Sequence, residues 1–165
     1  MILTKDAILN EIKNKTVKVT PFKKENIGPA SIDLTLDNKF RVMKDGLITL
    51  SENVNYKDYS KLAKGHKVYL KPGHFVLGIT KEKIKLPDYI CGWLTGRTRF
   101  ARLGLAVHVT ASFVNPGVNN KQVLEIKNVG ESEIILKPGL KICQLVLQRT
   151  EGKAKYKGKF QGQKL

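Results

Sequence analysis

The chain has 165 residues, of which 41% are hydrophobic and 27% charged, and its 30 Lys and Arg against 14 Asp and Glu give a formal net charge of +16. This length and composition predict one globular domain, residues 1–165, with a single core. No apolar run approaches the ~20 residues of a membrane-spanning helix. Residues 1–15 carry charges throughout and lack the apolar centre of a signal peptide, so a cytoplasmic location is expected.

The surplus of positive charge favours a polyanionic partner: nucleic acid, an anionic membrane surface or a multiply charged small molecule. The lysines are scattered in ones and twos along the whole chain, a distribution that favours a solvated lysine-rich surface over a nucleic-acid-binding stripe. Cys91 and Cys143 are too few for a disulfide framework and are not spaced as a metal-binding pair.

The predicted elements are one helix followed by short strands. Apolar residues at helical spacing after a potential N-cap at Thr4 predict an N-terminal helix. Leu-Lys-Pro-Gly occurs twice, at 70–73 and 136–139, and Pro-Gly suits a type II turn. Residues 51–65 and the lysine-rich link before Leu86 are expected to be loops. Strands are predicted at 17–20, 32–36, 39–43, 67–70, 75–79, 89–94, 133–136 and 142–148.

Many short strands with Pro and Gly between them predict a mainly β fold, a distorted β-barrel or jelly roll with a short N-terminal helix. The residues after 152 are rich in Gly and Lys and have few side chains that could pack in a core. We therefore expect 153–165 to be a mobile C-terminal tail that is able to close on an anion.

Residues 94–125 are the most informative stretch. Arg97, Arg99 and Arg102 form a cation cluster, and Glu125 is an isolated acid in an apolar run. Arginines that can fork onto phosphate oxygens, followed by a lone strand acid, suggest a site for a phosphorylated substrate. Spacing alone favours a solvent-facing acid at Glu125, and it does not separate phosphate binding from a solvated charge run at the arginines.

Several common catalytic motifs are absent from the sequence: the P-loop, the dinucleotide fingerprint and the Gly-x-Ser-x-Gly elbow. Zinc deaminases need His-x-Glu and Pro-Cys-x-x-Cys. None of His66, His74 and His108 is followed by x-Glu, and there is no Cys-x-x-Cys. Hydrolytic chemistry here would therefore use a carboxylate and a water without protein-bound zinc.

Blocks in the same order along nearly the whole chain resemble the dCTP deaminases, which share a superfamily with the trimeric dUTPases. The residues that carry the resemblance are Gly28-Pro-Ala-Ser-Ile-Asp-Leu, Gly96-Arg-Thr-Arg-Phe-Ala-Arg-Leu-Gly-Leu, His108-Val-Thr-Ala, Asn115-Pro-Gly, Val123-Leu-Glu and Lys159-Phe-Gln-Gly-Gln. The resemblance implies a dUTPase-like barrel that assembles as a homotrimer with active sites between subunits. It also implies hydrolysis of dCTP to dUTP and ammonia, with dUTP or dTTP as further possible ligands.

The resemblance also assigns roles to residues. Glu125 would be the general acid/base, Arg102 would stabilise its ionised form, and Thr98 with the Ala111 carbonyl would orient the water and the amine. Asn115 would accept a hydrogen bond from the sugar 3′-hydroxyl. Mg²⁺ would accompany the triphosphate rather than occupy a protein-ligated site. The remaining substrate-binding residues are Arg97, Arg99, Phe100, Ala101, Val123, Leu124, Tyr156, Lys159 and Gln163.

The chain departs from the family pattern at three positions, Phe113, Asn115 and Asn120. dUTPases carry a water-activating Asp at the position of Asn115 and generally an apolar residue at that of Glu125, while bifunctional members carry both acids. This chain has Glu125 but has Asn115 where dUTPases carry the water-activating Asp. The pattern favours deamination alone, with dUTP as the product. The alternatives are a dUTPase or a dUMP-forming bifunctional enzyme and, more remotely, a barrel that binds single-stranded nucleic acid.

Four further side chains are given structural interpretations. His108 is expected to be a satisfied core or interface histidine, and Asp33 to fix the turn after Gly28. Trp93 is expected in the core. Phe160 would either stack on the base or dock on a neighbouring subunit.

Overall fold

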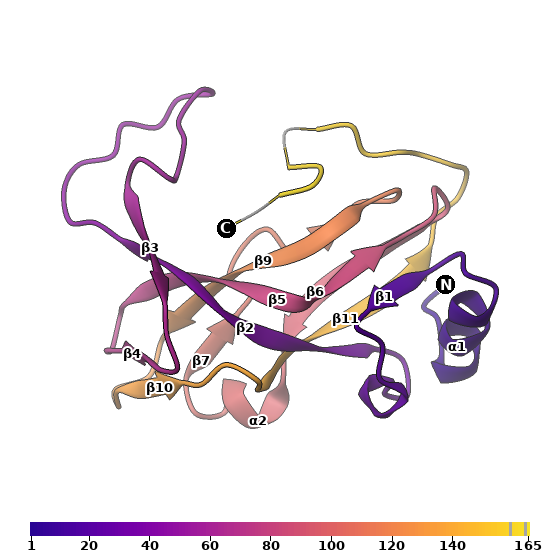
Figure 1. The fold of residues 1–165 in the computed structure, drawn as a ribbon, viewed down its shortest axis with the longest axis horizontal. Helices are drawn as coiled ribbons and strands as arrows, with labels where there is room; N and C mark the ends of the chain where they lie inside the picture. Colours follow the sequence, from indigo (N-terminus) through magenta and orange to yellow (C-terminus); the bar gives the residue numbers. More distant parts are fainter. Residues whose placement is uncertain (159, 164) are drawn as a thin grey trace.

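The computed structural model describes residues 1–158, 160–163 and 165, and its main feature is a strongly curled, nine-stranded sheet (Figure 1). The strands run in the order β7-β9-β5-β2-β11-β6-β8, with β1 paired to β5 and β3 paired to β2, while β10 and β4 form a separate pair. The elements are α1 (Lys5–Lys13), β1 (Lys18–Thr20), η1 (Lys24–Asn26), β2 (Ile32–Met43), β3 (Ser60–Lys64), β4 (Val68–Leu70), β5 (Phe75–Lys85), β6 (Ile90–Gly96), α2 (Thr98–Ala101), β7 (Leu105–Val107), β8 (Phe113–Val114), β9 (Asn119–Asn128), β10 (Ile134–Leu136) and β11 (Lys141–Arg149).

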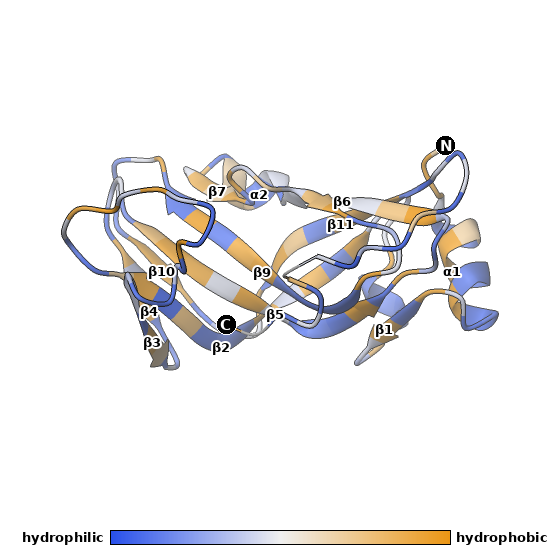
Figure 2. Ribbon diagram, turned by 90° about the horizontal axis from the view of Figure 1, so that it is seen from above, coloured by the Kyte–Doolittle hydropathy of each residue, from blue (hydrophilic) through white to orange (hydrophobic). Residues whose placement is uncertain are grey.

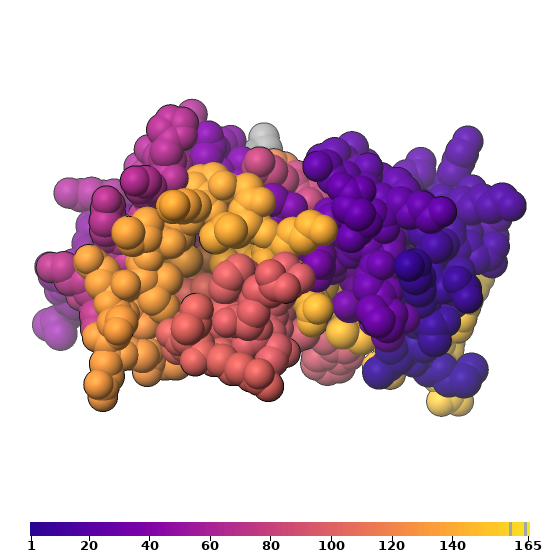
Figure 3. Space-filling model, turned by 90° about the horizontal axis from the view of Figure 1, so that it is seen from below, coloured from indigo at the N-terminus to yellow at the C-terminus, as the bar shows by residue number. Residues whose placement is uncertain are grey.

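The sheet curls into a half-barrel, which confirms the prediction of a mainly β, distorted barrel with a short N-terminal helix. Figure 2 shows the curl from above, with α1 at one end of the long axis. The space-filling view in Figure 3 shows the N-terminal residues at that end and the β10 region at the other. Among the described residues, no helix is long and apolar enough to cross a membrane.

The core follows the alternation that the sequence shows. Leu34 and Leu36 of β2, Leu124 and Ile126 of β9 and Leu145 of β11 are fully buried, while their neighbours in sequence are partly exposed. Period-two burial is what a strand with one face on the core requires. α1 adds Ile8 to this core, so its amphipathic face closes one end of the half-barrel.

Two loop predictions, for residues 51–65 and for the lysine-rich link before Leu86, were wrong in part. Both segments contain strand residues, and their many lysines made the alternation of buried and exposed positions hard to recognise. The lysine-rich link continues β5 to Lys85, with exposed Lys81, Lys83 and Lys85 alternating with buried Glu82 and Ile84. Residues 60–64, inside the predicted polar loop, form β3 against β2. The two strands predicted at 32–36 and 39–43 are one strand, β2, whose pairing with β5 shifts register in between.

The repeated Leu-Lys-Pro-Gly marks one antiparallel pair rather than two hairpins. Leu70 ends β4 and Leu136 ends β10, and these two strands pair with each other, each leucine being buried. Gly73 and Gly139 both have positive φ, as a type II turn requires.

Gly104 cannot be replaced without loss of stability. It has φ of +82°, and a Cβ there would lie 2.6 Å from the Cα of Gly130. We expect Gly104→Ala to lower the free energy of unfolding by about 2–3 kcal/mol, because backbone strain and a backbone clash add. Gly73→Ala is the matched control: φ is +77° but nothing lies within 4 Å. It should cost only about 1 kcal/mol. Denaturant unfolding measures both, and equal losses would contradict the role of the Gly130 contact.

Candidate active site

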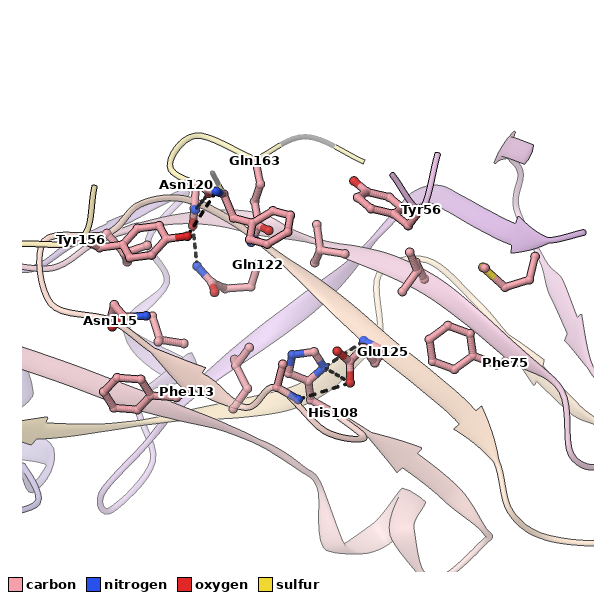
Figure 4. Close-up of a pocket in the computed structure, with 18 residues that line it drawn as sticks. Tyr56, Phe75, His108, Phe113, Asn115, Asn120, Gln122, Glu125, Tyr156 and Gln163 are labelled. Carbon is pink, nitrogen blue, oxygen red and sulfur yellow. Dashed lines mark hydrogen bonds and ion pairs between the residues drawn. The ribbon is translucent and has the colours of Figure 1, made fainter. Parts of the chain in front are cut away.

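A cavity of about 430 Å³ opens between β5, β9, the segment around β8 and the C-terminal tail (Figure 4). Figure 4 shows His108 and Glu125 side by side at one end, with Asn120 and Gln163 toward the other. Apolar side chains form much of the wall, and polar groups converge on it from both sides, an arrangement typical of small-molecule sites. The lining residues are Met43, Tyr56, Phe75, Leu77, Leu94, His108, Ala111, Phe113, Val114, Asn115, Val118, Asn120, Gln122, Val123, Glu125, Tyr156, Phe160 and Gln163.

Glu125 is held in one orientation by donors from the segment before β8. Its Oε2 accepts hydrogen bonds from the Thr110 backbone N–H and from the Thr110 hydroxyl, both at 2.7 Å, and a longer one from the Ala111 N–H at 3.4 Å. The carboxylate is half-buried in the cavity wall. Burial by itself would raise the pKa of Glu125, but these hydrogen bonds outweigh it and leave the pKa below its ordinary value. Glu125 is therefore ionised at neutral pH.

His108 supports Glu125 as a neutral imidazole. Its Nδ1 accepts the backbone N–H of Glu125 at 2.9 Å, so the ring proton lies on Nε2. Nδ1 also lies 3.6 Å from Oε2 of Glu125, but with its lone pair engaged it is not the cation of an ion pair. Burial lowers the pKa of His108, and its attraction to Glu125 only partly offsets this. His108 is thus a satisfied histidine, as the sequence predicted, with its side chain largely buried in the cavity wall, and it contacts the candidate catalytic acid.

Thr110 sets how acidic Glu125 is. We expect Thr110→Val to raise the pKa of Glu125, because it removes a hydroxyl donor to the charged form. The acid limb of kcat/KM should move to higher pH, while the plateau at neutral pH is preserved. Stability follows the same sign: with a depressed pKa, the stabilisation from these bonds is complete above the ordinary pKa and is lost as pH falls through the folded pKa. A pH–rate profile checks this, with Thr110→Ser as the control that keeps the hydroxyl. An unmoved limb would contradict the role of Thr110.

The structure gathers six of the predicted site residues in this cavity: Ala111, Asn115, Val123, Glu125, Tyr156 and Gln163. Leu124 is fully buried, so its side chain faces the core, and it does not line the cavity. Lys159 lies outside the described residues. Phe160 lines the cavity, where its carbonyl accepts a hydrogen bond from Asn120.

The arginine block does not line the cavity of its own chain. Arg97 is engaged elsewhere: it contacts Asp33 at 3.2 Å and donates to the Lys141 carbonyl. The rest of the block, Thr98 to Arg102, lies on and just after α2, which Figure 1 shows at the opposite edge of the molecule from the C-terminal tail. The hydrogen bonds that lower the pKa of Glu125 come from Thr110 and Ala111, and Arg102 takes no part in them. Within a single chain, the arginine block therefore lies apart from Glu125.

The structure adds a partner to one residue with a structural interpretation and corrects another. Asp33 was expected to fix the turn after Gly28, and its carboxylate contacts Arg97 at 3.2 Å. Trp93 was expected in the core, yet it is 44% exposed and packs against the equally exposed Phe113 with ring centroids 4.9 Å apart.

Sequence reasoning missed the polar residues that surround Glu125. Thr110 belongs to the block His108-Val-Thr-Ala, but its spacing along the sequence does not indicate a contact with Glu125. Gln122 donates to Asn120 at 2.8 Å inside the cavity, an amide pair that no motif signalled. The first contact joins a loop to a strand 15 residues further along the chain, and the second depends on two side chains on the same face of β9.

Residues 2–150 match the model of the family described as dCTP deaminase-like, and the chain belongs to that family. A relative from Salinispora arenicola, named dCTP deaminase, dUMP-forming, is 37% identical over 99% of this chain and 91% of its own length. A relative with the same name from Mycolicibacterium smegmatis is 38% identical over 99% of this chain and 93% of its own. These names give dUMP rather than the dUTP expected from the sequence.

Solved structures share the fold. The 2'-deoxycytidine 5'-triphosphate deaminase from Agrobacterium tumefaciens superposes with a TM-score of 0.71 at 18% identity, over 90% of this chain and 48% of that one. A Staphylococcus bacteriophage 80alpha dUTPase superposes with a TM-score of 0.53 at 15% identity, over 87% of this chain and 88% of that one. At these identities the likeness shows the fold alone.

Proposed function

We propose that this protein is an enzyme that hydrolyses the exocyclic amine of dCTP, giving dUTP and ammonia without a protein-bound zinc ion. The observation that carries this proposal is Glu125: an ionised carboxylate, fixed by Thr110 in the wall of a nucleotide-sized cavity. Membership of the dCTP deaminase-like family and the relatives' names support the substrate.

The chemistry requires a group that takes and returns protons. Water adds to C4 of cytosine while Glu125 removes its proton, and that proton passes to N3. The second proton of the water then reaches the amine through Glu125, the C4–N bond breaks, and ammonia leaves. Such a general acid/base contributes roughly 10²–10⁴-fold. In this proposal the Ala111 carbonyl and the Thr98 hydroxyl orient the amine and the water.

The arginine block then acts from a neighbouring subunit. Arg97, Thr98, Arg99 and Arg102 lie away from the cavity of their own chain, so they can meet a nucleotide only if another chain presents them. We propose a homotrimer, in which Arg102 of one chain approaches Glu125 of the next. Mg²⁺ would enter with the triphosphate as part of the substrate.

A second candidate product, dUMP, is favoured by the names of the relatives. It requires a further attack of water on the phosphate chain. Asn115 lines the cavity but its amide cannot take a proton from that water, which is why we place dUTP first.

The deciding experiment is chromatography of the products from dCTP and, separately, from dUTP. We expect ammonia and dUTP from dCTP in equal amounts and no pyrophosphate from dUTP. If dCTP gives ammonia together with dUMP and pyrophosphate, the product is dUMP rather than dUTP. If the folded protein releases no ammonia from dCTP, the proposed deamination is wrong.

A further inference from the structure

A second hollow lies beside the candidate active site, and its lining is cationic. This hollow has a volume of about 420 Å³ and is lined by Lys39, Lys83 and Lys121. We call it the lysine hollow. Asn120 and Gln163 line both this hollow and the cavity of Glu125. The two spaces are therefore neighbours that share a wall.

Two shifts of strand register lie beside this hollow. Between Leu36 and Phe40, four residue steps of β2 match two steps of β5, and Lys39 lies within that stretch. Between Ile79 and Lys83, four steps of β5 match two steps of β9, and Lys83 ends that stretch. Bulges redirect side chains and recur next to functional sites, so the cationic lining comes from specific local geometry.

The charges in the hollow are incompletely balanced. Lys83 and Lys121 are direct cross-strand partners, an arrangement that is destabilising for like charges. Among the described lining residues, Asp37 supplies the one side-chain carboxylate, and it contacts Lys121 at 2.8 Å. Leu165, the last residue of the chain, also lines the hollow. Three ammonium groups thus meet one acidic side chain and one terminal carboxyl group, so positive charge remains in excess, and an anion in the hollow would relieve the repulsion between the lysines.

β9 joins the hollow to the candidate catalytic acid. Lys121, Val123 and Glu125 occupy alternate positions and so lie along one face of the strand. Lys121 and Glu125 are four residue steps apart along β9, which corresponds to ~13 Å of extended strand. A nucleoside triphosphate has a comparable reach from base to terminal phosphate. Figure 4 shows Asn120 and Gln163 away from Glu125, toward the side of the cavity where the hollow begins.

We propose that the lysine hollow binds a linear phosphate chain: the outer phosphates of the nucleotide whose base lies at Glu125, or a free chain of the same chemistry. The assignment to the nucleotide rests on the proposed function, whereas binding of a free chain does not. Compact ammonium groups suit phosphate oxygens as point charges. The hollow would thus give one chain a phosphate grip of its own, separate from the arginine block.

The test compares single charge removals on one face of the sheet. Lys83→Gln and Lys121→Gln each remove one hollow charge. Lys127→Gln is the matched control, because Lys127 lies on the same strand and face as Lys121, is also half-exposed, and is not in the lining of either space. Calorimetry with inorganic tripolyphosphate at low salt should show about tenfold weaker binding for each hollow variant, as expected for one lost charge-assisted contact, and little change for the control.

The kinetic arm identifies the source of the phosphate chain. If it belongs to the nucleotide, KM for dCTP rises about tenfold with kcat retained, while inhibition by dCMP, which lacks the outer phosphates, is unchanged. Weaker tripolyphosphate binding with an unchanged KM assigns the hollow to a free phosphate chain. Tripolyphosphate affinities that are equal in wild type and both hollow variants overturn the proposal. An inactive wild type would instead defeat the proposed deamination and leave the calorimetric result standing.

Discussion

Glu125→Gln is expected to abolish ammonia release from dCTP and leave nucleotide binding close to that of the wild type. The amide keeps the shape of the side chain, and its oxygen can still accept the two Thr110 hydrogen bonds. What it loses is the ability to take a proton from water and return it to N3 and to the amine. Loss of a general acid/base of this kind lowers kcat by roughly 10²–10⁴-fold.

Two measurements separate this outcome from misfolding. Ammonia release follows the chemistry, and calorimetric titration with dCTP follows binding. Glu133→Gln, an exposed acid just before β10, makes the same chemical change outside the cavity and should leave both unchanged. A Glu125→Gln protein that binds dCTP and still turns it over would remove Glu125 from its proposed role.

The second large effect is recovery of activity when two inactive variants are combined. Arg102→Gln should be inactive by itself, as should Glu125→Gln, if both residues meet the same nucleotide. The structure keeps Arg102 away from the cavity of its own chain, since it follows α2 and is absent from the lining. A working site would therefore combine Glu125 of one subunit with Arg102 of another. In a randomly mixed closed oligomer, about one quarter of the sites would carry both native residues.

Co-expression with two different affinity tags, followed by sequential purification, isolates the mixed oligomers. We expect each variant alone to release no ammonia above background and the mixed oligomers to regain a substantial fraction of wild-type activity. Mixing the two purified variants without subunit exchange is the control. Mixed oligomers that stay inactive would contradict a shared site, and an active Arg102→Gln protein would remove Arg102 from the mechanism.

The fold was largely predictable because its signals are local. Alternating burial, Pro-Gly turns and the helical spacing in α1 each depend on neighbouring residues, and the predicted mainly β architecture was confirmed. The errors came where composition masked periodicity: the lysines of β5 made a strand look like a linker, although Glu82 and Ile84 are buried between them. Glu82 is tolerated there because it accepts the backbone N–H of Thr35.

The candidate site was predicted less completely. Resemblance selected Glu125, Asn115, Tyr156 and Gln163, and the structure gathers these in one cavity. It could not show that Thr110 holds Glu125. Nor could it separate the arginine block from the cavity of the same chain, because sequence order does not say which face of a curled sheet a short helix occupies.

By itself, the sequence determined the residue types, the strand alternation and the net charge of +16. These properties are written residue by residue and need no long-range contact. Only the tertiary structure decided which side chains meet: His108 and Thr110 at Glu125, Asp33 at Arg97, and Lys39, Lys83 and Lys121 around one hollow. Sheet curl, strand order and two β-bulges bring these groups together, and such long-range pairing depends on how the whole chain packs.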